Sequence, residues 1–164
     1  MCIRDRYWID FDNKTILKRT VVHKGSIFSI KILDDKIWTC GGDGFLCVLD
    51  PAVMMVEKSI RLSAQGLRCI ELVKDKLLVG GSDNHIRVVN PLSLDTEKIL
   101  HNAHSNSIFT MWFDGQSILY SGGRDAVLKL WETSTWKEVK NLPAHWFTIN
   151  KIIPVGDNNL VTVS

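Results

Sequence analysis

One short pattern, a glycine pair followed by an aspartate and an apolar run, occurs three times in the chain. The copies are TCGGDGFLCVLD at 39–50, VGGSDNHIRVVN at 79–90 and SGGRDAVLKLWE at 121–132. Their turn aspartates, Asp43, Asp83 and Asp125, are separated by 40 and 42 residues. Glycine permits backbone angles and close approaches that a Cβ would forbid, and aspartate favours turns, so each copy predicts strand, tight turn, strand. Self-similarity at this step indicates a repeat architecture.

Each repeat has the same order of parts around this pattern. A histidine or its replacement comes first, and an apolar run, a polar turn and a second strand lead to the glycine turn. A third strand, a polar or proline loop and a fourth, shorter strand complete the repeat. Four short strands in about 40 residues describe one antiparallel blade of a β-propeller. The apolar runs are too short and too often cut by Gly, Asp and Pro for a helical repeat. The first positions of the repeats are His23, Gln65, His104 and His145.

The repeat boundaries predict an incomplete propeller. Whole blades are expected at 23–63, 64–102 and 103–142, the tail of an earlier blade at 7–22 and the start of another at 143–164. Residues 1–6 resemble a translated sequencing adapter and are set aside from fold reasoning. Because the last repeat stops at its glycine turn, we expect an internal fragment of a longer reading frame, with exposed edges on its terminal blades.

Composition argues against several classes of partner. The 20 basic and 18 acidic residues give a net charge of +2, which is too balanced to favour nucleic acid or an anionic membrane. No apolar run approaches the roughly 20 residues of a membrane helix. Strand-like runs contain Cys40, Cys47 and Cys69 without a C-x-x-C pair, so we expect buried thiols, a reducing compartment and a cytoplasmic location.

The third whole repeat resembles the WD-repeat (WD40) β-propeller family. Ala103-His104, Ser121, Asp125 and Trp131 match the family's Gly-His, serine, aspartate and tryptophan positions. The resemblance implies a buried hydrogen-bond network that runs from the Trp131 indole to the Ser121 hydroxyl, then to His104 and Asp125. Buried polar groups of this kind each need a partner, and a satisfied network fixes one geometry.

The other repeats keep the pattern only in part. The first retains His23, Thr39 and Asp43 but has Leu49 at the tryptophan position. The second retains only Asp83, with Gln65, Val79 and Val89 elsewhere, and the last has His145, with Ser164 as a candidate hydroxyl. A blade can pack apolar side chains at these positions instead. These departures from the motif therefore argue against a complete network in those repeats and leave the predicted fold unchanged.

Catalytic readings are weaker than structural ones. His104, Ser121 and Asp125 are the ingredients of a nucleophilic triad, but their repetition and the presence of Trp131 favour a structural role. Neither His85 nor His101 has metal-ligand spacing, and no phosphate-loop motif is present. We therefore expect no catalytic, cofactor-binding or metal-binding residues and no small-molecule substrate.

The loops that follow the repeated histidines differ between repeats. In WD-repeat propellers such loops border the narrow face, a usual partner-binding surface, so the resemblance implies a non-catalytic scaffold for a protein or peptide. Trp146 and Phe147 are candidate anchors, Arg124 and Arg68 a charged rim, and Asn106 lies in another such loop. Alternatively, Trp146 packs between blades. Two other functions stay open: a regulatory or sensor domain of a larger multidomain enzyme and, ranked last, a propeller with its own catalytic centre.

Overall fold

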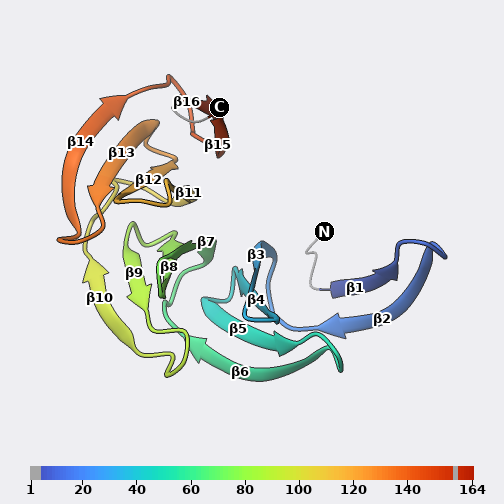
Figure 1. The fold of residues 1–164 in the computed structure, drawn as a ribbon. Coiled ribbons are helices and arrows are strands. Elements are labelled where there is room, and N and C mark those ends of the chain that lie inside the picture. The colour runs from blue at the N-terminus through green and yellow to red at the C-terminus, as the bar shows by residue number, and fades with distance from the viewer. Residues whose placement is uncertain (1–4, 157–158) are drawn as a thin grey trace. The chain divides into compact units, whose positions relative to one another are not determined.

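The structure is a computed structural model that describes residues 5–156 and 159–164, and every regular element within them is a β-strand (Figure 1). The first sheet pairs β1 (Asp5–Asp10) with β2 (Thr15–Val21). Three four-stranded sheets follow. The first contains β3 (Ile27–Leu33), β4 (Lys36–Gly41), β5 (Phe45–Asp50) and β6 (Met55–Arg61), and the second contains β7 (Leu67–Val73), β8 (Lys76–Gly81), β9 (Ile86–Val89) and β10 (Thr96–Leu100). The third contains β11 (Ile108–Phe113), β12 (Ile118–Gly123), β13 (Val127–Glu132) and β14 (Lys137–Pro143). The last sheet pairs β15 (Lys151–Val155) with β16 (Asn159–Val163). The prediction of an all-β fold with four-stranded antiparallel blades is confirmed.

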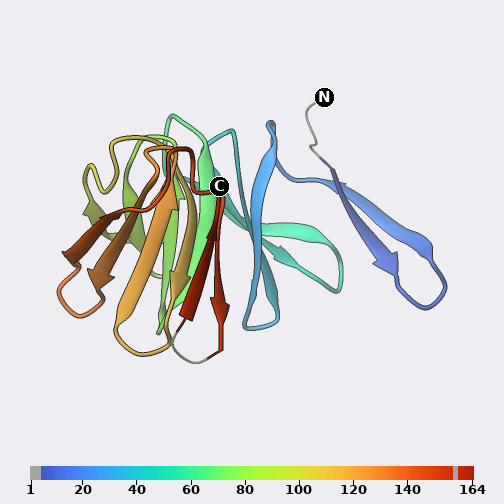
Figure 2. The same ribbon diagram turned by 90° about the horizontal axis from the view of Figure 1, so that it is seen from above.

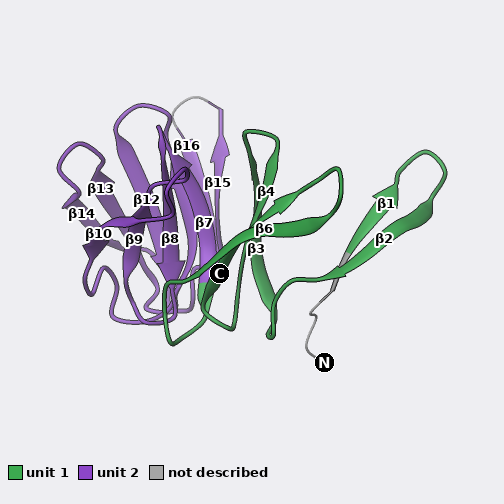
Figure 3. Cartoon of the chain, turned by 90° about the horizontal axis from the view of Figure 1, so that it is seen from below, with its two compact units in different colours: residues 1–67 green, residues 68–164 purple. Residues whose placement is uncertain are grey.

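The chain forms two compact units, residues 1–67 and 68–164 (Figure 3). The first unit contains β1–β6, and the second contains nearly all of β7 and every later strand. Within each sheet, strands that follow one another in the sequence are neighbours, which is the meander expected of hairpin-linked strands.

Most predicted strand starts agree with the structure, and two positions differ. The apolar run INKIIPV of the last repeat predicts a strand from Ile149, but the strand begins at Lys151, and the Ile149 amide donates to the Gly123 carbonyl at 2.9 Å. Strand β1 includes Asp5 and Arg6, which pair with Val21 and Thr20. The strand thus begins inside the segment that sequence analysis sets aside, and residues 1–4 of that segment lie outside the described residues.

The glycine pair of the third blade is required by close packing. A Cβ on Gly123 would lie 2.1 Å from the Ser107 carbonyl oxygen, and one on Gly122 would lie 2.8 Å from Ile149 Cγ2. Both distances are shorter than atoms tolerate, so only glycine lets the neighbouring segments approach.

A left-handed residue follows the turn aspartate in every whole blade. These residues are Gly44 (φ 78°), Asn84 (φ 70°) and Ala126 (φ 62°). Glycine and asparagine adopt this conformation readily, whereas alanine adopts it at a cost. The repeated turn geometry is therefore kept even where the residue type does not favour it.

Alternate residues of the β11–β14 sheet face two different neighbours. Leu119 and Trp131 pack in a buried cluster with the β7–β10 sheet, while Tyr120 and Leu130 pack on the β15–β16 sheet. This follows from the two-residue period of a strand. Figure 2 shows the sheets of residues 68–164 standing side by side. Each interface is thus a sheet face packed on a sheet face, and the polar network lies within the first of them.

Candidate functional site

The four motif residues of the third blade form one buried network. His104 Nδ1 lies 3.0 and 2.9 Å from the two carboxylate oxygens of Asp125, and its Nε2 lies 2.7 Å from Ser121 Oγ. The Trp131 indole donates to the same hydroxyl at 2.8 Å. His104, Ser121 and Trp131 are all buried.

The hydrogen-bond pattern around His104 accommodates a neutral imidazole. A neutral imidazole with its proton on Nδ1, pointing at Asp125, lets the Ser121 hydroxyl accept from Trp131 and donate to His104 Nε2. Burial lowers the pKa of His104 below its usual value, although the Asp125 charge opposes this shift. A neutral His104 therefore satisfies every member of the network.

This geometry assigns Ser121 a structural hydroxyl. A nucleophilic serine must contact the substrate, but Ser121 is fully buried and its oxygen is shared between Trp131 and His104. The arrangement resembles a catalytic triad in residue types only.

The first whole blade has a shorter version of the network. His23 Nδ1 lies 2.8 Å from Asp43, and its Nε2 lies 3.0 Å from Thr39. Burial raises the pKa of Asp43, but hydrogen bonds from His23 and from the Lys24 and Phe45 amides outweigh it and leave the pKa below its usual value. Leu49 is fully buried at the tryptophan position, and it needs no hydrogen-bond partner.

In the second whole blade, Asp83 binds an arginine instead of a histidine. The Arg87 guanidinium donates from Nη1 at 3.1 Å and from Nη2 at 2.5 Å to the two Asp83 oxygens. Arg87 is only 6% exposed, and Val79 and Val89 are fully buried beside it in the sheet. Sequence reasoning listed Asp83 among the residues of a structural hydrogen-bond network and noted Gln65 at the histidine position; Gln65 is exposed, and the partner of Asp83 is Arg87, which was not named. The sequence signal for this pair was a basic residue, Arg87, four residues after the turn aspartate and within an apolar run that forms a buried strand.

In the last repeat, His145 Nε2 lies 2.6 Å from Thr162 Oγ1. The hydroxyl partner is thus Thr162 and not Ser164. The spacing of 17 residues equals that between His104 and Ser121, so the sequence held the information needed to find it.

The most exposed aromatic residues of the second unit lie in one loop between β14 and β15. Trp146 is 96% exposed and Phe147 is 77% exposed. Both ends of the loop are fixed, because the His145 amide donates to the Ala126 carbonyl at 3.3 Å and the Ile149 amide to the Gly123 carbonyl at 2.9 Å. The alternative that Trp146 packs between blades does not describe this structure.

Three other predicted partner-binding residues lie in different settings. Arg124 is exposed in the turn that holds this loop, and its amide donates to the Ser107 carbonyl at 2.9 Å. Asn106 is exposed in the neighbouring loop, where its side chain accepts from the Ser107 amide at 2.8 Å. Arg68 donates to Ser82 Oγ at 2.7 Å and lies over the Phe109 ring at 5.4 Å, so its guanidinium is engaged within the protein.

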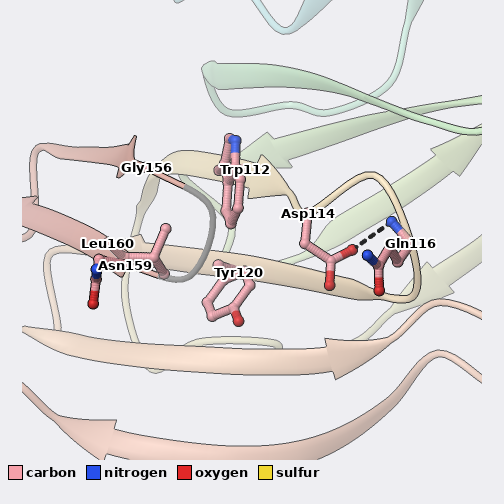
Figure 4. Close-up of a pocket in the computed structure, with 7 residues that line it drawn as sticks. All are labelled: Trp112, Asp114, Gln116, Tyr120, Gly156, Asn159 and Leu160. Carbon is pink, nitrogen blue, oxygen red and sulfur yellow. Dashed lines mark hydrogen bonds between the residues drawn. The ribbon is translucent and has the colours of Figure 1, made fainter.

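A cavity of about 410 Å³ separates the β11–β12 hairpin from the β15–β16 hairpin (Figure 4). Trp112 and Tyr120 form one wall with ring centroids 5.3 Å apart, and Leu160 faces them. Asp114 lies at the turn, where its Oδ1 accepts from the amides of Gln116 and two following residues at 2.7–3.0 Å. Sequence reasoning assigned these residues to strands and turns and none of them to a site, because the cavity depends on how two sheets meet.

Within residues 5–156 and 159–164, no group of three or more His, Cys, Asp or Glu side chains is arranged to hold a metal ion. No helix in those ranges is long and apolar enough to span a membrane.

Comparisons with known proteins agree with this architecture. A family model described as WD domain, G-beta repeat matches residues 96–132, which run from β10 to the end of β13 and include His104, Ser121, Asp125 and Trp131. No curated protein sequence matches the chain.

Solved structures with similar folds include three informative cases. The WD40 β-propeller domain of Doa1 is 13% identical with a TM-score of 0.81, over 90% of this chain and 50% of that one. A chain in the crystal structure of the Mitotic Checkpoint Complex is 17% identical with a TM-score of 0.84, over 97% and 51%. The computationally designed protein Ika8 is 17% identical with a TM-score of 0.70, over 85% and 43%. The chain spans about half the length of these structures; its fold is that of a β-propeller, and its residues 96–132 match the WD-repeat model.

Proposed function

We propose that this chain is a non-catalytic scaffold that binds a protein or peptide through the loop face around Trp146 and Phe147. The observation that carries the proposal is an exposed aromatic pair on a loop whose two ends are hydrogen-bonded to one turn. WD-repeat propellers generally serve as protein-interaction scaffolds, and one structural neighbour comes from a multiprotein complex.

Two properties of this loop favour partner binding: the large surface of its aromatic side chains and its hydrogen-bonded ends. Large aromatic side chains contribute most of the energy of many interfaces, because they bury much surface with few rotatable bonds. An anchored loop loses less conformational freedom when a partner binds. Arg124 follows Gly123, whose carbonyl holds one end of the loop, so it supplies a positive charge at the rim that favours a partner with an acidic group beside its apolar one.

Peptides selected from a phage-displayed random library on the wild-type chain would test the proposal. Trp146→Ala should abolish binding of the selected peptides, and Arg124→Ala should weaken it. Phe11→Ala is the matched control, because Phe11 is 90% exposed in the β1–β2 turn and belongs to the other compact unit.

The melting temperature separates the two roles of Trp146. An unchanged melting temperature with lost binding supports the interface. Equal loss of binding in Phe11→Ala and Trp146→Ala, or retained binding in Trp146→Ala, would contradict it. A large drop in melting temperature would show that Trp146 belongs to the core.

A further inference from the structure

The loop between β10 and β11 is fastened to the second whole blade by a histidine side chain. The Asn102 backbone amide donates to His85 Nδ1 at 3.1 Å. His85 is half-buried in the turn between β8 and β9. A second histidine, His101, is exposed in the loop, and its ring lies edge-on to the His85 ring with the centroids 5.0 Å apart. Neither histidine belongs to the repeated motif, so the blade geometry does not account for this contact.

The contact between Asn102 and His85 requires a neutral ring. A backbone amide can only donate, so Nδ1 accepts with its lone pair, and the neutral ring carries its proton on Nε2. A ring in this state has no lone pair left for a metal ion. A protonated ring carries a proton on both nitrogens, which would place two donors against each other. Protonation of His85 is therefore incompatible with the closed contact.

The charged groups around this contact come from its own turn, from the loop and from the β12–β13 turn. Asp83 accepts from the His85 amide at 3.4 Å, but both of its carboxylate oxygens also bind the Arg87 guanidinium, which offsets the charge. The loop contacts Asp125, whose carboxylate is engaged by the network of the third blade. From the loop itself, His101 faces His85, and two protonated rings at this separation repel each other.

The loop that this contact holds also carries other functional parts of the second unit. The His104 amide donates to the Asn84 carbonyl at 3.3 Å, and the Asn84 side chain donates to the Ser105 carbonyl at 3.4 Å. Asn106 is exposed in the same loop. Asn102 has φ 50°, a left-handed conformation that asparagine tolerates better than most residues. Loss of the bond to His85 thus frees a residue that has no intrinsic preference for the closed loop.

We propose that His85 is a pH-sensitive latch, which holds the β10–β11 loop closed while its ring is neutral and releases the loop when the ring is protonated. Histidine ordinarily titrates near pH 6.5. The closed loop binds one proton fewer than the open loop, so it is favoured above this pH and is lost as the pH falls. Because Ser107 of this loop accepts from the Arg124 amide, release also changes the loop face that contains Asn106 and Arg124.

Exchange of the Asn102 amide with solvent tests the latch. It is measured by NMR on the 164-residue chain and divided by the intrinsic exchange rate at each pH. Protection of this amide should fall by up to about tenfold between about pH 7.5 and pH 5.5. The reference is the Leu94 amide, which donates to the Asn90 carbonyl at 2.9 Å in another turn of the same blade and should keep its protection. Constant protection at Asn102, or an equal fall at both amides, would overturn the proposal.

Two variants assign the pH dependence to one ring. His85→Asn places an amide oxygen near the position of Nδ1 and does not titrate, so protection of Asn102 should be the same at both pH values. His101→Asn is the matched control and should keep most of the fall, since His85 is unchanged. A fall in His85→Asn equal to that of the wild type would assign the effect to another group, such as His104, and would exclude the latch.

Ring ¹⁵N chemical shifts of the wild-type chain give a test that needs no variant. At about pH 7.5, His85 should have an unprotonated Nδ1 and a protonated Nε2. A proton on Nδ1 at this pH would exclude the hydrogen bond from Asn102 and, with it, the latch. These measurements use no partner, so their outcome is independent of the scaffold function proposed above.

Discussion

The second and third whole blades build the same geometry with different side chains. The third blade joins His104, Ser121, Asp125 and Trp131 in a polar network, whereas the second has apolar Val79 and Val89 and pairs Asp83 with Arg87. Both are four-stranded meanders with the same turn after the second strand. The network is therefore one solution to filling a blade interior and not the cause of the blade.

The difference also shows where each blade is vulnerable. A buried polar group is tolerated when its partners are complete, and removal of one partner strands the others. In the second blade the turn aspartate is paired by a single arginine, whereas in the third blade the buried polar groups of four side chains satisfy one another. Single substitutions should thus have larger effects on the pair than on the network.

The largest expected effect is at the ion pair. Arg87→Met should reduce the free energy of unfolding by about 3–5 kcal/mol, because it leaves the Asp83 carboxylate without its cation in a mostly buried site. Urea unfolding followed by tryptophan fluorescence would measure the loss. The double variant Asp83→Asn with Arg87→Met keeps a side-chain oxygen for the turn and removes the charge. It should regain much of the stability, and no recovery would show that the methionine itself is the defect.

The next effect is in the network of the third blade. Trp131→Phe removes the indole donor to Ser121 and should cost about 1–3 kcal/mol in the free energy of unfolding. Trp136→Phe is the comparison, since Trp136 is only partly buried against the same cluster. Similar losses in the two variants would mean that ring size and not the hydrogen bond determines the cost.

The sequence predicted the parts of this architecture that repeat. The step between Asp43, Asp83 and Asp125, the glycine pairs and the four apolar runs were sufficient for the blades. The residues expected in the network of the third blade do lie together, because their spacing follows from strand pairing and turn length.

The remaining features depend on packing between elements, which a motif comparison does not describe. Arg87 resembles a solvent-facing charge in the sequence, and only the buried strand makes it a partner for Asp83. The exposure of Trp146 depends on which residues lie around it, and these are determined by the path of the β14–β15 loop. The cavity between the third blade and the β15–β16 sheet depends on how these two sheets meet.

A smaller effect should appear on acidification. Because the pKa of His104 in the folded chain lies below its usual 6.5, the unfolded chain binds the proton more readily. Stability from this group is complete above the unfolded pKa and falls as the pH drops from about 6.5 towards the folded pKa, by at most about 1.4 kcal/mol per pH unit. His104→Gln, which copies the residue type of the second blade, should remove this component from urea titrations at several pH values. An identical pH slope in the variant would assign it to another group.

The smallest expected effect is a stabilisation at the turn of the third blade. Ala126 has φ 62°, at the position where the first blade has Gly44. A non-glycine residue in this conformation costs about 1–2 kcal/mol, and glycine costs roughly 0.5–1 kcal/mol more than alanine in backbone entropy. Ala126→Gly should therefore raise the free energy of unfolding by about 0.5–1 kcal/mol. Gly44→Ala is the reciprocal change and should destabilise the first blade, since its Cβ would also meet the Ser63 carbonyl oxygen. If Ala126→Gly lowered the stability, the local backbone would be relaxed in the alanine form, and the turns of the two blades would differ in more than residue type.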